Sequence, residues 1–185
     1  KYHRIERILV TPLLSAVGAV PRENFKADKS ITNPMKTSSP THFPDVNEII
    51  NILLINVQGN LGDQFVGMYL YGSLANGDFD QHSDIDVLVV TDSDLSDGLF
   101  EAVKGMHERI TKIASRWAVQ LEVSYIPQSA LRRFNQQNNT HPHMDRGNGE
   151  ILHRMPHESD WIVTRHSLRE HGITITGPDL KSLID

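Results

Sequence analysis

Hydrophobic residues recur at helical spacing between residues 45 and 61 of the chain. Seven apolar side chains there lie three or four positions apart: Val46, Ile49, Ile50, Leu53, Leu54, Val57 and Leu61. Asp45 precedes them as a candidate N-cap, and Gly59 or Gly62 marks the end of the pattern. We therefore expect an amphipathic helix over this segment, at the start of the compact part of the chain.

Two apolar runs after this helix are typical of neighbouring β-strands. The first reads FVGMYLYGS over 65–73, and the second reads DIDVLVVTD over 84–92. A longer helix is predicted next from Leu99, Val103, Met106, Ile110, Ile113, Ala114 and Trp117. A third strand, VQLEVSYIP over 119–127, alternates in polarity and closes on a proline.

The remaining segments carry weaker patterns. Residues 21–44 contain four prolines and little apolar periodicity, and residues 135–158 are rich in Asn, His, Gly and Pro, which indicates a long loop or lid. The last segment predicts a helix from about Trp161 to Glu170, a stop at Gly172, a short strand and a Gly-Pro turn.

These elements predict a chain of the mixed α/β (α+β) class. We expect residues 1–44 to form an N-terminal arm or linker and residues 45–185 to form one domain. The domain should contain a mixed β-sheet of about four to five strands flanked by helices.

Composition narrows the function classes. With 185 residues, 38% hydrophobic residues and a formal net charge of -5, the chain suits one ordinary domain and disfavours a nucleic-acid binder that relies on a broad cationic surface. No cysteine is present, which excludes disulfides, thiolate metal sites and a cysteine nucleophile, and agrees with the cytoplasmic location we expect. No apolar run is long enough for a membrane span. The N-terminal 20 residues faintly resemble a secretory signal, which Glu6 and Pro12 oppose.

Asp84 and Asp86 are the first candidate site residues. Residues two apart in a strand point the same way and lie ~6–7 Å apart, so the two carboxylates project together while Ile85 and Val87 face the core. Two bare carboxylates so close raise one another's pKa, and a divalent cation removes that penalty. Mg²⁺ is typically held by one or two carboxylates and the phosphates of a substrate, so the pair indicates a nucleotide site.

Gly72 and Ser73 supply the complementary half of such a site. Glycine lets the backbone approach a ligand closely, and a serine that opens a short helix offers a hydroxyl and free N–H groups to phosphate oxygens. A third carboxylate is then expected, either as an additional metal ligand or as the group that takes a proton from the attacking hydroxyl. Glu122 is the best candidate, because it interrupts an otherwise apolar strand.

The stretch YGSLANGDFDQHSDIDVLVV at 71–90, followed by LEVSYI at 121–126, resembles the nucleotidyltransferases of the DNA polymerase β superfamily. Gly-Ser, a gap of about ten residues, Asp-x-Asp and a later acidic residue form the signature of that superfamily. Within it, the chain is most similar to the streptomycin/spectinomycin type of aminoglycoside adenylyltransferase and its uncharacterised relatives. REHGITITGPDLKSLID at 169–185 resembles the end of their catalytic domain.

The resemblance implies a polymerase β-like fold over roughly residues 45–185 and a role for each matching residue. Gly72 and Ser73 would contact the nucleoside triphosphate, Asp84 and Asp86 would ligate Mg²⁺, and Glu122 would act as the base. The implied reaction is in-line attack of a substrate hydroxyl on the α-phosphorus, with release of pyrophosphate, driven by positioning and charge neutralisation.

We therefore expect transfer of AMP from ATP to a hydroxyl of a small cationic acceptor such as an aminoglycoside, which an acidic surface would attract. One alternative is a minimal nucleotidyltransferase of toxin-antitoxin type that adenylylates a protein or RNA, and another is a catalytically silent nucleotide-binding module. In the resembled antibiotic-modifying enzymes a helical domain follows the catalytic one, whereas this sequence stops at Asp185. Either a helical domain is missing from this sequence, or the protein works without one and a second subunit or another partner completes its site.

Other polar residues leave two interpretations open. Arg165 and Arg169 lie four apart on one predicted helix face and would either reach the triphosphate or pair with nearby acids; we take Arg165 as a candidate nucleotide ligand. Four histidines invite a zinc hypothesis, but their spacing fits no closed site well, and solvated loop histidines are favoured. They are His141, His143, His153 and His157. Asp78 and Asp80 are interpreted as loop acids rather than ligands.

Overall fold

A computed structural model describes residues 39–133, 140–156 and 161–185 of the chain, which belong to one compact unit. Most of the predicted N-terminal arm, up to residue 38, lies outside the described residues. Within the described ranges, no helix combines the length and the apolar character needed to cross a membrane.

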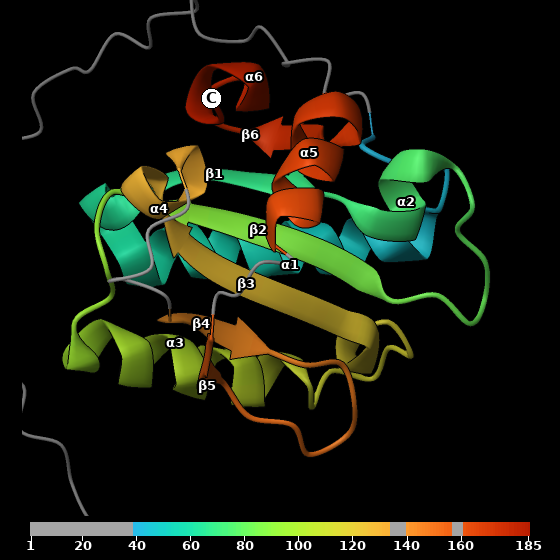
Figure 1. Cartoon of the computed structure of the whole chain (residues 1–185). Helices are drawn as coiled ribbons and strands as arrows, with labels where there is room; N and C mark the ends of the chain where they lie inside the picture. Colours follow the sequence, from blue (N-terminus) through green and yellow to red (C-terminus); the bar gives the residue numbers. More distant parts are fainter. Residues whose placement is uncertain (1–38, 134–139, 157–160) are drawn as a thin grey trace, which may run out of the picture. The chain divides into compact units, whose positions relative to one another are not determined.

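Helices and strands alternate along the described residues (Figure 1). The helices are α1 (Pro44–Leu61), α2 (Gly72–Asn76), α3 (Asp97–Ile110), α4 (Gln128–Arg132), α5 (Trp161–His171) and α6 (Leu180–Leu183), with 3-10 turns at Gly62–Gln64 and Ala118–Gln120. The strands are β1 (Phe65–Leu70), β2 (Ile85–Thr91), β3 (Leu121–Pro127), β4 (Thr140–Met144), β5 (His153–Pro156) and β6 (Ile173–Thr176). The predicted mixed α/β class is confirmed.

The strands of the described residues form one mixed sheet in the order β5-β4-β3-β2-β1-β6. β2 and β3 run parallel and the other neighbouring pairs are antiparallel. Parallel neighbours need a crossover connection, which α3 provides here. The topology therefore places the strand of Asp86 directly beside the strand of Glu122.

The sheet has six strands rather than the expected four to five, because the segment predicted as a loop or lid contains β4 and β5. β4 pairs with β3 and β5 extends the sheet beyond it. These two strands carry histidine and proline at positions where apolar alternation would signal a strand, and Pro142 and Pro156 each lie within one of them.

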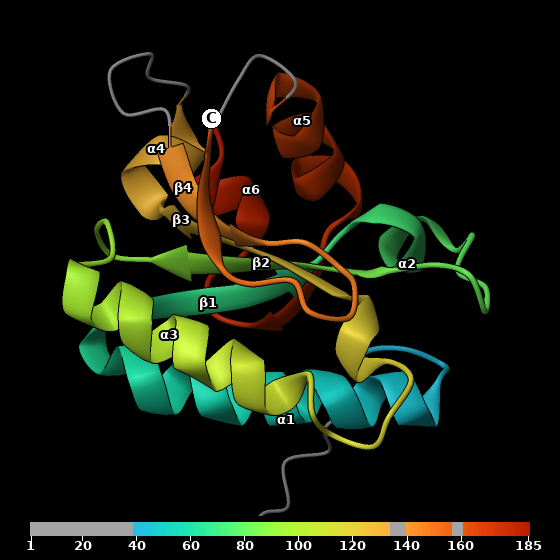
Figure 2. The ribbon, with the colours of Figure 1, turned by 90° about the horizontal axis from the view of Figure 1, so that it is seen from below.

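Helices cover both faces of the sheet (Figures 1 and 2). α1 and α3 pack on one face, where Ile85, Val87 and Val89 join the larger core cluster. α4, α5 and α6 pack on the other face against Leu88 and Val90. Since Asp86 shares its strand face with Leu88 and Val90, the candidate site lies on the side covered by α4, α5 and α6.

Two predicted helix ends are wrong. α1 begins at Pro44, with Phe43 as the N-cap residue, so Asp45 lies in the first turn instead of capping it; a proline in the first turn lacks only an N–H that would be unpaired there. α3 ends at Ile110 rather than near Trp117. The apolar spacing continued to Trp117 because that side chain is buried from a turn, where it contacts Phe79.

The predicted C-terminal elements are confirmed in type and place. α5 starts at Trp161, whose side chain is buried, and the helix ends at His171 just before Gly172. β6 follows and pairs with β1 at the sheet edge. A turn through Gly177, with φ of 109°, then leads into α6.

Candidate active site

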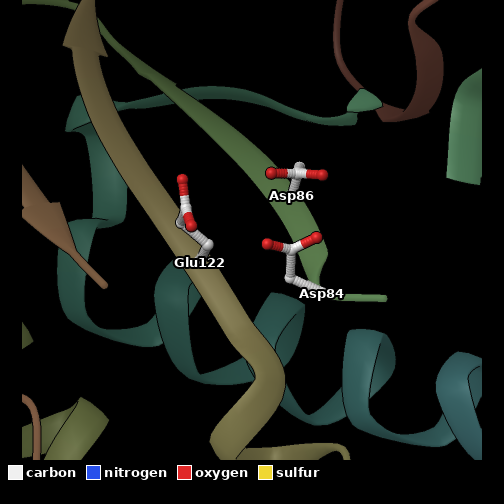
Figure 3. Close-up of side chains that lie close together, drawn as sticks. All are labelled: Asp84, Asp86 and Glu122. Carbon is white, nitrogen blue, oxygen red and sulfur yellow. The ribbon is translucent and has the colours of Figure 1, made fainter. Parts of the chain in front are cut away.

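Asp84, Asp86 and Glu122 converge on one space above β2 and β3 (Figure 3). Asp86 and Glu122 are direct partners in the parallel register of the two strands, and Asp84 immediately precedes β2. Each carboxylate offers an oxygen that lies within 4.8 Å of those offered by the other two. The predicted acidic trio is therefore brought together by strand alternation and strand pairing.

Burial and mutual repulsion raise the pKa values of two members of the trio, Asp86 and Glu122. Burial, followed by the charges of Asp84 and Glu122, raises the pKa of Asp86 to about 7. Burial also raises the pKa of Glu122, with Asp84 and Asp145 adding to the effect. Three carboxylates held this close favour either a bound proton or a bound cation.

Arg146 is a charged neighbour that the sequence patterns did not reveal. Its guanidinium Nη1 lies 3.3 Å from Oδ2 of Asp84, and its charge lowers the pKa values of Asp86 and Glu122 in part. Arg146 follows β4 in the connection to β5, a stretch with no periodicity from which a contact with β2 could be read. One cation beside three acids leaves the site net negative.

Gly72 and Ser73 lie directly beside the acids, at the start of α2. Gly72 has φ of 63°, in the left-handed region that favours glycine, and a side chain there would overlap the Asp86 carboxylate. The Ser73 hydroxyl is buried and has no hydrogen-bond partner among the described residues. An unpaired buried hydroxyl is costly, so this one is suited to a ligand oxygen.

We expect Gly72→Ala to destabilise the protein and to displace the Asp86 carboxylate. The substitution combines left-handed backbone strain, worth about 1–3 kcal/mol, with the steric overlap. Gly77→Ala is the matched control, since Gly77 has φ of 86° at the end of α2 but no atoms near its missing side chain. Urea unfolding should show a larger loss for Gly72→Ala, and equal losses would contradict the predicted contact with Asp86.

His143 lies next to Glu122, on the neighbouring strand β4. Its Nδ1 is 2.9 Å from the Ser124 hydroxyl, and its Nε2 faces two carboxylates, 3.4 Å from Oδ1 of Asp145 and 4.0 Å from Oε1 of Glu122. Burial lowers the pKa of His143, and Asp145 opposes that effect. His153 approaches the other Asp145 oxygen at 3.7 Å.

A cavity of about 220 Å³ opens beside Glu122 and these groups. It is lined by Tyr71, Glu122, Ser124, His141, His143, Asp145, Met155, Trp161 and Thr164. Burial, and then the charge of Asp86, raises the pKa of Tyr71, so its hydroxyl stays protonated. The cavity thus combines aromatic walls with the carboxylate of Asp145 and that of Glu122, a member of the acidic trio.

Arg165 occupies a different place from the acids. Its side chain is buried, and the guanidinium donates hydrogen bonds to the carbonyls of Leu131 at 3.0 Å and Ala130 at 3.1 Å in α4. It lines another cavity together with Arg132 and Arg169. These hydrogen bonds connect α5 to α4. A contact between Arg165 and a triphosphate stays a prediction.

The histidines and the two loop acids of the sequence lie in different surroundings. His141 and His143 are buried on β4, so the expectation of solvated loop histidines is wrong for them; His157 lies outside the described residues. Among the described side chains, the acidic trio is the one group placed to hold a metal ion, and no histidine belongs to it. Asp78 and Asp80 are exposed loop residues, as predicted.

The donor set of the trio fits Mg²⁺. Carboxylate oxygens are the ligands that this hard cation prefers, whereas zinc sites draw on histidine and cysteine. The raised pKa values of Asp86 and Glu122 point the same way, because a cation among the three groups would relieve the repulsion that raises them.

The segment that carries this site matches a known protein family. Residues 58–143 match the nucleotidyltransferase domain family, and this range contains Gly72, Ser73 and all three acids. No curated protein shows significant sequence similarity to the chain.

Two of the solved structures that match the chain do so to different degrees. The spectinomycin adenyltransferase AAD(9) from Enterococcus faecialis, solved with ATP and spectinomycin, superposes with a TM-score of 0.59 at 21% identity, over 75% of this chain and 59% of that one. A toxin-antitoxin structure with AMP-PNP gives a TM-score of 0.38 at 14% identity, over 71% and 77% of the two chains. The chain thus spans about three fifths of the adenyltransferase. Residues 58–143 thus match a nucleotidyltransferase domain, and the chain shares the fold of the adenyltransferase.

Proposed function

We propose that this domain is a Mg²⁺-dependent nucleotidyltransferase that moves AMP from ATP to a hydroxyl group of a small cationic acceptor. The observation that carries the proposal is the convergence of Asp84, Asp86 and Glu122 within the matched domain. ATP as the donor is supported by the adenyltransferase of similar fold, which was solved with ATP and spectinomycin.

Asp84, Asp86 and Glu122 would hold the metal ion. Bound Mg²⁺ would neutralise negative charge on the phosphate oxygens as the α-phosphorus is attacked. Because the three carboxylates already share one space, their oxygens need little rearrangement to bind it. Arg146, paired with Asp84, adds a positive charge at the edge of the same site.

Gly72 and Ser73 would contact the triphosphate. Without a side chain at Gly72, the backbone lies against the Asp86 carboxylate and leaves a phosphate oxygen free to approach both. The buried Ser73 hydroxyl, which lacks a partner among the described residues, would donate a hydrogen bond to that oxygen.

Glu122 would take the proton of the acceptor hydroxyl. The hydroxyl oxygen forms a bond to the α-phosphorus, the bond from that phosphorus to the pyrophosphate oxygen breaks, and the proton passes to the carboxylate. A carboxylate has two oxygens, so Glu122 can offer one to the cation and the other to the proton. Its raised pKa suits a proton acceptor.

A cationic acceptor is supported by the charges around the cavity beside Glu122. Asp145 and Glu122 line it, and the chain as a whole carries a formal net charge of -5. Such a surface attracts positive molecules and repels anionic ones. Tyr71 and Trp161 add aromatic faces that a cation can approach.

The test is pyrophosphate release from ATP and Mg²⁺ on addition of streptomycin, spectinomycin or kanamycin. Stimulation by one of them, with AMP found on its hydroxyl by mass spectrometry, supports the proposal. AMP on a protein or RNA, with no response to the three compounds, would instead favour a nucleotidyltransferase of toxin-antitoxin type. No turnover with any acceptor, in a protein that binds ATP, would leave a silent nucleotide-binding module.

A further inference from the structure

We propose that His143 is a positioning residue that holds Glu122 towards the acidic trio and separates it from Asp145. This inference rests on the proposed function, because it gives Glu122 a place in the metal site. His143 itself lies outside the trio and approaches Glu122 from the neighbouring strand β4.

The position of His143 is fixed by the sheet. In the β3–β4 register it is the direct partner of Ser124, which lies two residues after Glu122 on the same strand face. The side chain is only 6% exposed, and Nδ1 is bound by the Ser124 hydroxyl at 2.9 Å. A ring packed in this way has one orientation, so the direction of Nε2 is set by the fold.

The surroundings of the two ring nitrogens decide which one carries the proton. Nε2 faces oxygens of Asp145 and Glu122, at 3.4 and 4.0 Å, and an unprotonated nitrogen there would point its lone pair at two negative charges. The favoured neutral tautomer therefore has its hydrogen on Nε2. Ser124 then donates its hydroxyl hydrogen to Nδ1.

In this tautomer the Nε2–H faces two carboxylates that otherwise repel, and the nearer one, Asp145, is within hydrogen-bonding distance of it. Asp145 raises the pKa of Glu122, so the two groups interact through space. Asp145 takes the shorter contact with Nε2, and the Glu122 carboxylate remains close to Asp84 and Asp86 (Figure 3), with oxygens of the three within 4.8 Å of one another. The terminal torsion of glutamate is broad, so an adjacent donor is an effective means of limiting it.

Three substitutions of His143 distinguish the contribution of its Nε2–H donor from that of the packing of its ring. His143→Gln places an N–H near the position of Nε2, His143→Asn places one near Nδ1, and His143→Leu has none. We expect His143→Gln to keep the Mn²⁺ affinity of the metal-free protein within about threefold, and the other two to weaken it by about tenfold or more. Mn²⁺ serves as the probe, because carboxylates bind it as they bind Mg²⁺ and free Mn²⁺ is counted directly by electron paramagnetic resonance.

Two controls test whether His143 affects Mn²⁺ binding through Glu122. His153→Leu, on the same hairpin, removes a histidine that contacts Asp145 and should leave the Mn²⁺ affinity within about twofold. In a Glu122→Gln background, His143→Leu should add no further loss, because a double-mutant cycle shows coupling only where the two residues act together. Melting temperatures of all variants, measured without metal, separate lost packing from lost binding.

The two proposals fail in different ways. If the unsubstituted protein binds no Mn²⁺, the metal site is wrong and the role of His143 falls with it. If the unsubstituted protein binds Mn²⁺ and His143→Leu binds it equally well, only the role of His143 is overturned. Should His143→Leu fail to fold, equal affinities for the Gln and Asn variants would overturn that role in the same way.

Discussion

Asp86→Asn is expected to abolish nucleotidyl transfer and, at the same time, to raise the melting temperature of the metal-free protein. The substitution removes a proposed metal ligand, and stabilisation of transition-state charge by a bound cation is worth several kcal/mol, or a factor of about 10³ or more in turnover. It also removes one of three carboxylates whose oxygens lie within 4.8 Å of one another. Function and stability should therefore move in opposite directions.

The size and sign of the stability effect follow from the pKa of Asp86. A carboxyl whose pKa rises from 3.8 to about 7 on folding binds its proton more tightly in the folded state, so stability from this group is present below about pH 4 and is lost as the pH rises to 7. At full value the loss is about 4 kcal/mol. Because the group is only partly buried and Arg146 lies near the trio, we expect about 1–2 kcal/mol, or about 2–8 °C.

Thermal unfolding at several pH values checks this expectation. The advantage of Asp86→Asn over the unsubstituted protein should be small near pH 4 and largest above pH 7, and saturating Mg²⁺ should raise the melting temperature of the unsubstituted protein alone. Asp78→Asn, in an exposed loop, is the matched control and should change neither quantity. A lower melting temperature for Asp86→Asn at pH 8 would show that its carboxylate stabilises the fold.

Local periodicity was enough to predict the two aspartates of this site, whereas the role of Glu122 also depended on the family resemblance. The alternation of Asp84 and Asp86 with Ile85 and Val87 predicted which side chains face the core, and the packing of the latter two in the core cluster confirms it. Glu122 was predicted because a third carboxylate was expected at the metal site and this residue interrupts an otherwise apolar strand. The parallel pairing of β2 and β3 then placed Glu122 opposite Asp86.

The groups behind the acids could not be predicted in this way. His143 and Arg146 reach the site because β4 adds to the edge of β3 in an antiparallel register, a long-range pairing with no local signal. β4 has a proline at its centre and histidines on either side of it, so a polarity pattern identifies it as a loop. For Arg165, charge and helical spacing suggested a triphosphate or a nearby acid, and its hydrogen bonds to two carbonyls of α4 had no local signal either.

Glu122→Gln is expected to lower kcat by about 10²–10⁴ and to weaken Mn²⁺ binding by only about tenfold, the loss also expected for His143→Leu. The amide keeps the shape of the side chain and one oxygen that can contact the cation, but it cannot accept the proton of the attacking hydroxyl. Turnover measured by pyrophosphate release, with Mn²⁺ affinity measured in parallel, separates the two roles of this residue.

Glu150→Gln, an exposed acid in the β4–β5 connection, is the matched control and should retain full turnover. Equal losses of affinity and kcat in Glu122→Gln would mean that the carboxylate acts as a metal ligand alone. Retention of more than about a third of turnover would contradict any role in proton transfer, because a general base contributes at least about 10². The acceptor proton would then have to leave through another group, and Asp145, which shares the cavity with Glu122, is the carboxylate placed to receive it.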